Sequence, residues 1–421
     1  MNLQQLSWEL STLTIFRDLD RDDVFCQFQS MLSVLDRINN RTTAALFAKQ
    51  LYHHNTDNWS EYIRDLVFTM PTPCTYFAGC GKPIPANIEV AARHDLRVLS
   101  IAASVTPELV SYCMNADGLY FPSWRAEPID LELMYFERLK NIGKYGFGIF
   151  AKHKMFHMER SANSEKGYIL EPAAYPDSIT LDDLIGYEMQ RTQIIENTKI
   201  LLSGSKAANI LLYGDAGTGK SATVKAIANT FADEGLRVIE LSKNELHLLP
   251  RLLDALGSNP MKFILFIDDL SFHDDDDDFS ALKAVLEGSI SARTKNTVIY
   301  ATSNRRHMVH ETFSQREGDE VHRNDTMQEM ISLSERFGIK VYFEKPNKDL
   351  YLNIVKALAK QYGLKISDDE LSLEAERFAM RKCGRSARAA RQLIEQLAAK
   401  EALNPPAAPR KRKSAKTRSD K

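Results

Sequence analysis

The segment GDAGTGKS, residues 214–221, constrains the fold of this chain more than any other feature of its sequence. An apolar run, NILLY (209–213), precedes it, and a helical pattern closed by Gly235 follows it. Glycines let the backbone bend around an anion, and successive N–H groups at a helix N-terminus point toward that anion. The segment therefore predicts a phosphate-binding loop between a buried strand and a helix.

Each position of this loop has an expected role toward ATP and Mg²⁺, the ligands that the pattern predicts. Lys220 reaches the β and γ phosphates, and Ser221 supplies a metal ligand of the oxygen type that Mg²⁺ prefers. The other expected contacts to the nucleotide come from Gly214, Asp215, Ala216, Gly217, Thr218, Gly219 and Ala222. The alternative is a glycine-rich turn before a helix that binds no ligand.

Short apolar runs alternate with helical patterns between residues 205 and 345, as in a parallel sheet covered by helices. We expect an α/β fold with a five-stranded parallel sheet, whose strands are 209–214, 236–242, 262–269, 296–304 and 339–344. Apolar residues spaced by three and four then predict a small helical bundle from the segments 350–364, 372–383 and 387–403.

Two aspartates directly follow the apolar strand of LFIDD, residues 265–269. They leave the carboxyl end of the strand, where open α/β sheets bind their ligands. We expect Asp268 to complete the Mg²⁺ shell through water, and Asp269 to polarise the water that attacks the γ phosphate. Asn304 ends a strand that the order of the segments places between the loop and the acidic pair. It is expected to hydrogen-bond that water or the γ phosphate.

Other carboxylates near this strand have simpler interpretations. Residues 274–278 are five adjacent aspartates that repel one another, so we expect a solvated loop. Asp278 is placed to cap the helix that follows. Glu287 is a reserve candidate for the base, and the alternative is a solvent-facing position on that helix.

Composition divides the chain into an N-terminal region, a nucleotide-binding α/β domain, a helical lid and a tail, at 1–172, 173–346, 347–403 and 404–421. Two prolines and a polar cluster in 169–183 indicate the linker before the α/β domain. The N-terminal region is expected to be mixed α/β or mostly helical, with a helix at 24–40 and a candidate strand at 96–104. Its Cys74 and Cys80 lack the further His or Cys that a metal site requires.

The tail carries a charge of +6 in a chain of net charge −2, and it contains no large apolar residue. We expect it to be disordered. Such a tail binds nucleic acid through counterion release, or only keeps a protein soluble. The sequence shows no signal-peptide pattern and no apolar run of the roughly 18 residues that a membrane span needs, so we expect a cytoplasmic protein without a membrane contact.

Several motifs together resemble those of the AAA+ ATPases. GDAGTGKS is similar to their Walker A, LFIDD to their Walker B and IYATSN (299–304) to their sensor 1. The resemblance covers about residues 175–402, and the chain looks most similar to an uncharacterised bacterial family of predicted AAA+ ATP-binding proteins. One departure is the second acid of Walker B, which is Asp269 here and Glu in most of the superfamily.

The resemblance implies further site residues. In the segment 182–198, the backbone near Ile185 and Gly186 is expected to cradle adenine. Arg336 stands where the family has its arginine finger, which points into the nucleotide of a neighbouring subunit, so a homo-oligomer, as in a ring, is implied. Sensor 2 aligns best with Arg388, ahead of Arg385 and Arg391. Arg305 and Arg306 follow Asn304 and either contact a neighbouring protomer or polymer, or face solvent.

Three functions are compatible with these features. The first is an oligomeric, Mg²⁺-dependent ATP hydrolase that remodels an unknown protein client or a nucleic acid. The second is an ATP-gated binding switch of initiator or loader type with little turnover. The third is a P-loop kinase, against which the inserted strand and the two candidates for trans-acting motifs count.

Overall fold

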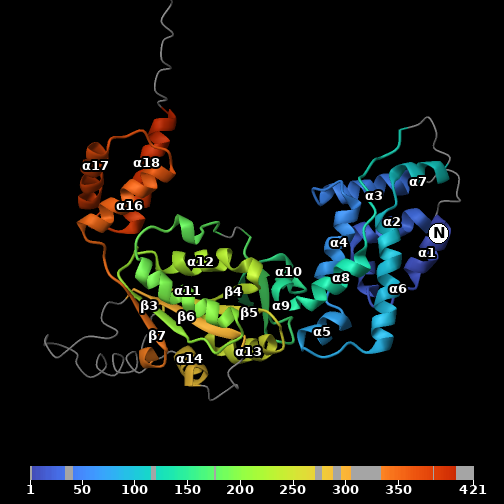
Figure 1. The fold of residues 1–421 in the computed structure, drawn as a ribbon, viewed down its shortest axis with the longest axis horizontal. Coiled ribbons are helices and arrows are strands. Elements are labelled where there is room, and N and C mark those ends of the chain that lie inside the picture. The colour runs from blue at the N-terminus through green and yellow to red at the C-terminus, as the bar shows by residue number, and fades with distance from the viewer. Residues whose placement is uncertain are drawn as a thin grey trace, which may run out of the picture.

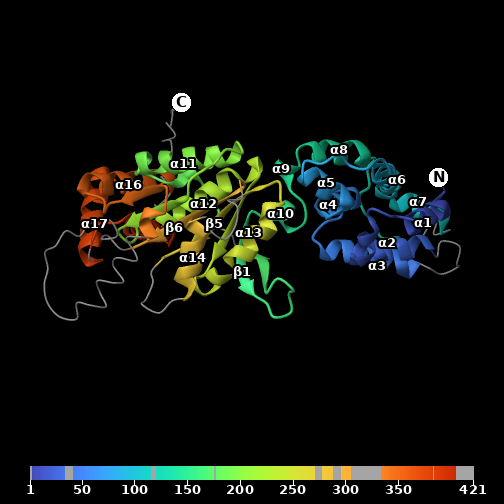
Figure 2. The ribbon, with the colours of Figure 1, turned by 90° about the horizontal axis from the view of Figure 1, so that it is seen from below.

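The computed structural model describes residues 2–33, 41–114, 120–174, 177–270, 277–287, 295–304, 333–382 and 384–403. Figures 1 and 2 show a helical N-terminal part, a central α/β domain and a C-terminal helical lid, with the first and the last at opposite ends of the central domain. Within the described residues, no helix combines the length and apolar character needed to cross a membrane.

The N-terminal part is helical where the structure describes it. Its helices are α1 (Leu3–Ser11), α2 (Asp23–Ser33), α3 (Arg41–His53), α4 (Trp59–Thr69), α5 (Pro73–Gly79), α6 (Ala86–Ala103), α7 (Pro107–Cys113), α8 (Leu131–Lys140), α9 (Ile142–Tyr145) and α10 (Ile149–Lys152), with a 3-10 turn η1 (Arg17–Arg21). The strand predicted at 96–104 is wrong. That segment belongs to α6, where Leu96, Leu99 and Ala103 recur at helical spacing and are buried in one core.

Aromatic rings in tilted and edge-to-face contact form the centre of this N-terminal core. The ring of Trp59 lies 4.5 Å from that of Phe28 and 4.9 Å from that of Phe47, and Phe47 in turn contacts Trp124 at 4.9 Å. The indole nitrogen of Trp59 donates to the carbonyl of Ala102 at 3.0 Å, which ties α4 to the end of α6. The N-terminal helices therefore have a hydrophobic core of their own.

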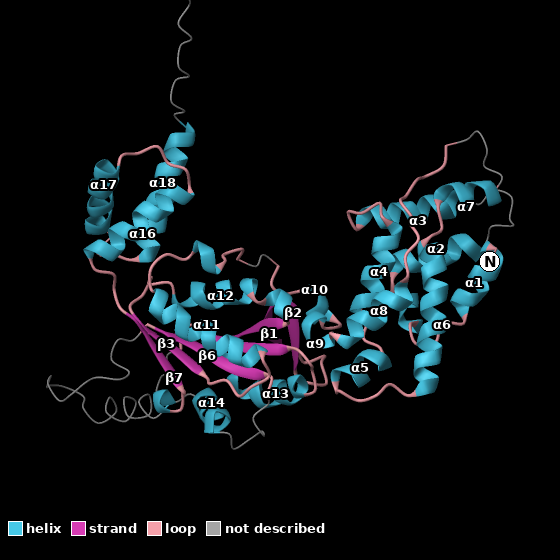
Figure 3. Ribbon diagram, in the orientation of Figure 1, coloured by secondary structure: helices cyan, strands magenta, loops and turns pink. Residues whose placement is uncertain are grey.

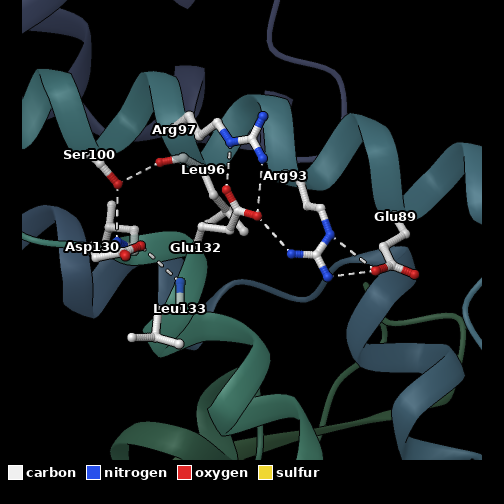
Figure 4. A network of polar contacts seen from close by, with 9 residues as sticks. Glu89, Arg93, Leu96, Arg97, Ser100, Asp130, Glu132 and Leu133 are labelled. Atoms are coloured by element: carbon white, nitrogen blue, oxygen red, sulfur yellow. Dashed lines mark hydrogen bonds and ion pairs between the residues drawn. The ribbon is translucent and has the colours of Figure 1, made fainter.

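Charged side chains join α6 to α8 on the surface of this part, as Figure 4 shows. Arg93 donates to Glu89 on its own helix at 2.6 Å and to Glu132 of α8 at 2.7 Å. Arg97 donates to the same Glu132 at 2.6 Å. These side chains are partly exposed, so each pair contributes at most about 1 kcal/mol to stability, and their main effect is to fix the register of the two helices.

The central domain contains one seven-stranded sheet in the order β2-β1-β4-β5-β6-β3-β7, drawn in magenta in Figure 3. Its strands are β1 (Met155–Arg160), β2 (Tyr168–Pro172), β3 (Ile210–Gly214), β4 (Leu236–Leu241), β5 (Lys262–Ile267), β6 (Thr297–Ser303) and β7 (Ile339–Phe343). The five predicted strands, β3 to β7, are confirmed and are parallel, and β6 is inserted between β3 and β5 as expected. The expected α/β fold with an inserted central strand is confirmed, but the sheet has seven strands and not the five expected.

The two strands that the sequence did not predict form an antiparallel hairpin at one edge of the sheet. β1 pairs with β2 along its length and runs parallel to β4 over Met155 to His157. Both strands keep exposed side chains, so they lack the continuous apolar run that marks a buried parallel strand. The sheet therefore begins at Met155, inside the stretch 1–172 that the sequence assigned to the N-terminal region.

Helices cover both faces of this sheet. α11 (Glu188–Leu202) and α12 (Lys220–Thr230) share one apolar core with it, and α13 (Leu249–Gly257) and α14 (Asp277–Glu287) share the core on the other face. Along β5, Phe263, Leu265 and Ile267 belong to the second core, whereas Ile264 and Phe266 belong to the first. This alternation buries β5 on both sides, which is why its sequence is an unbroken apolar run.

The lid consists of the three predicted helices, α16 (Lys348–Gln361), α17 (Asp368–Arg381) and α18 (Ala387–Leu403). Asn347 caps α16 and Ser367 caps α17 through their side chains. The three helices enclose a separate core that includes Tyr351, Phe378 and Leu393.

Candidate nucleotide-binding site

Glycines determine the backbone conformation of the loop between β3 and α12. Gly214 has φ +128°, and a Cβ there would lie 2.2 Å from the carbonyl oxygen of Phe343 on β7. Gly219 has φ +96° and occupies the N-cap of α12 in the left-handed conformation. Thr218 closes the turn by donating to the carbonyl of Asp215 at 2.9 Å. The loop therefore presents the N-terminus of α12 to the carboxyl edge of the sheet, where an anion is favoured.

Lys220, the first residue of α12, is a buried cation. Its side chain is only 5% exposed, and its Nζ donates to the carbonyls of Gly214 at 3.0 Å and Asp215 at 2.7 Å. Burial lowers the pKa of the Lys220 ammonium to about 8. An anionic ligand in the loop would stabilise the charged form that burial disfavours.

The expected metal-side residues lie in direct contact. The hydroxyl of Ser221 donates to Oδ1 of Asp268 at 2.6 Å, which joins the first turn of α12 to the end of β5. Asn304 donates its side-chain amide to Oδ1 of Asp269 at 2.9 Å. The structure therefore brings the loop, the acidic pair and Asn304 together at the ends of three neighbouring strands.

The segment before α11 lies at the other end of the cavity and contacts the lid. Ile185 lines the cavity and packs against the lid core. Gly186 has φ +76°, and a Cβ there would lie 2.9 Å from Cδ1 of Leu350 on α16. Gly186 thus permits the close approach of the lid, and the apolar wall of the cavity comes from Ile185, Ile354 and Leu358.

The lid arginines differ in their positions. Arg388 and Arg391 line the cavity, and the backbone N–H of Arg388 donates to the carbonyl of Gly217 at 3.1 Å. Arg385 instead pairs with Glu376, at 3.0 and 2.7 Å, and this pairing raises the pKa of its guanidinium. Arg388 and Arg391 therefore belong to the wall of the cavity, whereas Arg385 pairs within the lid.

Three residues at the site did not follow from the motifs. Arg191 lines the cavity from the first turn of α11, and burial lowers the pKa of its guanidinium. Asp183 also lines it and accepts hydrogen bonds from the backbone and hydroxyl of Thr180, which lower the pKa of that carboxyl. Thr302, at the end of β6, contacts Asp268. The only sequence signal for them was proximity to a motif.

Two predicted residues lie elsewhere. Arg336 does not line this cavity but donates through Nε to Glu287 of α14 at 2.9 Å, so Glu287 is not near the loop either. Asp215 belongs to the loop, but its carboxylate accepts from the backbone of Lys345 at 2.9 Å. Residues 274–276, Arg305, Arg306 and the tail 404–421 lie outside the described residues, as does the side chain of Asp278, although α14 begins at Asp277.

The cavity fits a magnesium nucleotide. It has a volume of about 590 Å³ and is lined by the loop residues Ala216 to Thr223, by the acidic pair with Asn304, and by the lid arginines. The loop contributes a buried ammonium and a helix N-terminus, which suit phosphate, and Ile185, Ile354 and Leu358 contribute an apolar wall, which suits a base. Ser221 and Asp268 supply the oxygen donors that suit Mg²⁺.

No cysteine or histidine is among the described residues that line this cavity. The thiols of Cys74 and Cys80 are free, and the described residues contain no cluster of three or more His, Cys, Asp or Glu that would hold a metal ion by themselves. A metal held by Ser221 and Asp268 would complete its shell with oxygen ligands from the nucleotide and water, as is usual for Mg²⁺ bound with phosphates.

The chain is similar to a protein family over more than half of its length and to solved structures at low identity. A family model described as "Protein of unknown function (DUF815)" matches residues 151–401. Two mutant forms of Thermotoga maritima RuvB align with 17% identity and a TM-score of 0.37, over 53% of this chain and 66% and 65% of theirs. The Thermotoga maritima RuvB Holliday junction branch migration motor aligns with 15% identity and a TM-score of 0.31, over 52% of this chain and 72% of that one. The chain thus spans just under two thirds of the two mutant structures. The search of curated proteins finds no match.

Proposed function

The chain belongs to the family of proteins of unknown function DUF815, and on that premise we propose that it is a Mg²⁺-dependent AAA+ ATPase. One observation supports the proposal most directly. A single cavity is lined by the buried ammonium of Lys220, the Ser221–Asp268 pair, and the lid residue Arg388. A structural glycine turn would not need a desolvated cation beside two carboxylates, because burying an unpaired charge is costly.

The residues of the cavity divide the work of hydrolysis among them. Lys220 and the N–H groups at the start of α12 bind the phosphates and orient the γ phosphate. Ser221 and Asp268 would hold Mg²⁺, which would supply positive charge to offset the negative charge of the phosphates. Asp269 is the candidate that orients and polarises the attacking water, with Asn304 holding its carboxylate at 2.9 Å.

Arg336 supports an oligomer as the working form. It does not line the cavity of its own chain and forms an ion pair with Glu287, so within this chain it is not placed to contact the nucleotide. A guanidinium placed on the γ phosphate stabilises the charge that grows during transfer, and such residues contribute roughly 10³ to 10⁵ in rate. We therefore propose a homo-oligomer, in which Arg336 leaves Glu287 for the neighbour's phosphate.

The second candidate is the ATP-gated switch with little turnover. The observation that favours it is the state of Asp269, whose side chain is one methylene shorter than Glu and already accepts a hydrogen bond from Asn304. Under either function the lid is the responsive part, because Arg388 would meet the γ phosphate only while it is present. The partner that is remodelled, a protein client or a nucleic acid bound by the tail 404–421, stays a prediction from sequence.

Steady-state phosphate release, measured against protein concentration, tests the proposal. An oligomeric ATPase should release more phosphate per subunit as concentration rises, and Arg336→Ala should remove most of that rise. Arg377→Ala is the matched control, because Arg377 is an exposed arginine on α17 that pairs with Glu374. Tight ATP binding with almost no turnover would favour the switch, and a rate per subunit that is the same at every concentration and in Arg336→Ala would contradict the oligomeric mechanism.

A further inference from the structure

We propose that Thr302 is the positioning residue of the acidic pair, setting the carboxylate of Asp268 and the backbone turn at Asp269 for Mg²⁺. This inference rests on the proposed function of the cavity as a magnesium nucleotide site. No motif assigned a role to Thr302, which lies on β6 between the strand of the loop and the strand of the acids.

Thr302 makes hydrogen bonds to three consecutive residues after β5. Its hydroxyl donates to Oδ1 of Asp268 at 2.5 Å and accepts from the backbone N–H of Asp269 at 2.9 Å. Its carbonyl oxygen accepts from the backbone N–H of Leu270 at 2.7 Å. Because Thr302 is only 2% exposed, water does not compete for these bonds.

The middle one of these three residues is in a strained conformation. Asp269 has φ +53°, in the left-handed region, which costs a residue with a Cβ about 1 kcal/mol or more. The two bonds from the backbone of Asp269 and Leu270 to Thr302 hold this turn. This left-handed turn directs the carboxylate of Asp269 toward Asn304 and the cavity. Thr302 therefore fixes the direction in which both acids leave the sheet.

The bond to Asp268 matters most when the site holds metal. At present Oδ1 of Asp268 accepts from both Ser221 and Thr302, at 2.6 and 2.5 Å. A hydroxyl oxygen keeps its lone pairs while it donates its hydrogen, so Ser221 can offer its oxygen to Mg²⁺ and still donate to Asp268. The hydroxyl of Thr302 is the second donor that orients the carboxylate, and partners of this kind typically change metal affinity or activity 10- to 100-fold when removed.

The spacing of β6 explains why Thr302 and Asn304 act together. Successive side chains of a strand point to opposite faces, so residues two apart share a side. Thr302 holds the backbone of Asp269, and Asn304 holds its carboxylate. The end of β6 therefore contacts the acidic pair twice, through Thr302 and through Asn304. The resemblance to sensor 1 identified only the contact of Asn304.

The test compares Thr302→Val, which keeps the shape and removes the hydroxyl, with Thr302→Ser, which keeps the hydroxyl. The probe is Mn²⁺ in the presence of ADP, with metal affinity measured by electron paramagnetic resonance and ADP affinity measured separately without metal. We expect Thr302→Val to weaken Mn²⁺ binding about 10- to 100-fold and to leave metal-free ADP binding within about twofold. Thr302→Ser should stay within about threefold of the parent chain in both.

Thr198→Val is the matched control, because Thr198 is a fully buried threonine on α11 whose hydroxyl bonds to Tyr300 away from the acids. Unchanged Mn²⁺ affinity in a folded Thr302→Val protein would overturn the proposal. So would equal losses of Mn²⁺ and metal-free ADP binding, matched by Thr198→Val, because these indicate a general structural role. If the parent chain binds neither ADP nor Mn²⁺ with ADP, the proposed function itself has failed.

Discussion

The central domain contacts the N-terminal helices and the lid in two different ways. Where the central domain contacts the N-terminal helices, backbone atoms pack directly against backbone atoms. A Cβ on Gly235 would lie 2.2 Å from the carbonyl oxygen of Gly143, and a Cβ on Gly143 would lie 3.2 Å from the carbonyl oxygen of Pro260. Arg237 is buried in this contact and donates to the carbonyl of Phe150 at 2.6 Å. Such a junction has little room to change.

Toward the lid, single polar bonds carry much of the contact. The N–H of Arg388 donates to Gly217, and Gln361 donates to Asp183 at 2.7 Å across an exposed surface. Ile185 packs against the apolar core of the lid. These contacts surround the nucleotide cavity, so a ligand that enters the cavity acts on them directly.

Two elements of the central domain have one end at the nucleotide cavity and the other end at the contact with the N-terminal helices. α12 begins at Lys220 in the cavity and is followed by η3 (Ala232–Glu234), which packs on α9 of the N-terminal part. β5 likewise runs from the junction, beside Pro260, to the acids at its carboxyl end. We therefore expect the N-terminal helices to move as one body with the nucleotide domain and the lid to move against it.

The largest effect is expected from breaking the rigid junction. Gly235→Ala places a Cβ against the carbonyl of Gly143 and forces a left-handed conformation, φ +95°, on alanine. We expect a loss of roughly 3 kcal/mol or more in the free energy of unfolding, measured by urea denaturation. Gly81→Ala is the control, since Gly81 has φ +65° but open space around it, and it should lose only about 1 kcal/mol. Equal losses in the two variants would show that the junction is not tightly packed.

A smaller effect is expected from the lid arginine. Arg388→Ala should lower kcat about 100-fold while changing ADP affinity little, because Arg388 lines the cavity and is proposed to contact the γ phosphate, which ADP lacks. Arg385→Ala should change kcat much less, since Arg385 pairs with Glu376 inside the lid. Single-turnover hydrolysis of both variants measures this difference. A larger loss in Arg385→Ala than in Arg388→Ala would reverse the assignment.

The smallest effect is expected in the pH dependence of ADP affinity at the cavity beneath the lid. Burial lowers the pKa of Lys220 to about 8, so the free protein loses the ammonium as pH rises through that value. Nucleotide binding needs the charged form, and we expect ADP affinity to be about tenfold weaker at pH 9 than at pH 7. Binding above pH 8 should take up a proton, visible as a buffer-dependent heat. Lys220→Arg keeps its charge and should show a flat profile. A slope as steep in Lys220→Arg as in the parent chain would assign the titration to another group.

The sequence predicted the parts of the fold where local pattern and tertiary environment agree. β5 is buried on both faces, so its apolar run identified it, and the loop from Gly214 to Ser221 carries its conformation in its glycines. The hairpin of β1 and β2 has exposed positions and was missed. α6 was assigned a strand at 96–104 because a short apolar run does not by itself distinguish a helix from a strand.

The residues of the site likewise fall into those that the sequence predicted and those that it did not. Lys220, Ser221 and Asp268 are tied to a motif and lie together as their spacing implies. The sequence placed the strand end that contains Thr302 beside the acidic pair but gave Thr302 no role of its own, because its bonds to Asp268 and Asp269 depend on the pairing of β6 with β5. Arg191 reaches the site through the packing of α11, which is a long-range contact that no local pattern encodes. The ion pair of Arg336 with Glu287 joins segments 49 residues apart in sequence, and was likewise not predictable.

Isothermal titration calorimetry with ADP and Mg²⁺ tests the central claim, that the cavity around Lys220 binds a nucleotide. The parent chain should bind one nucleotide per subunit, and Lys220→Ala should bind at least about 100-fold more weakly, since it loses a buried charge-assisted contact to phosphate. Lys225→Ala, on the same helix but not lining the cavity, should bind like the parent chain. No heat from the parent chain, or equal affinity in Lys220→Ala, would contradict the account.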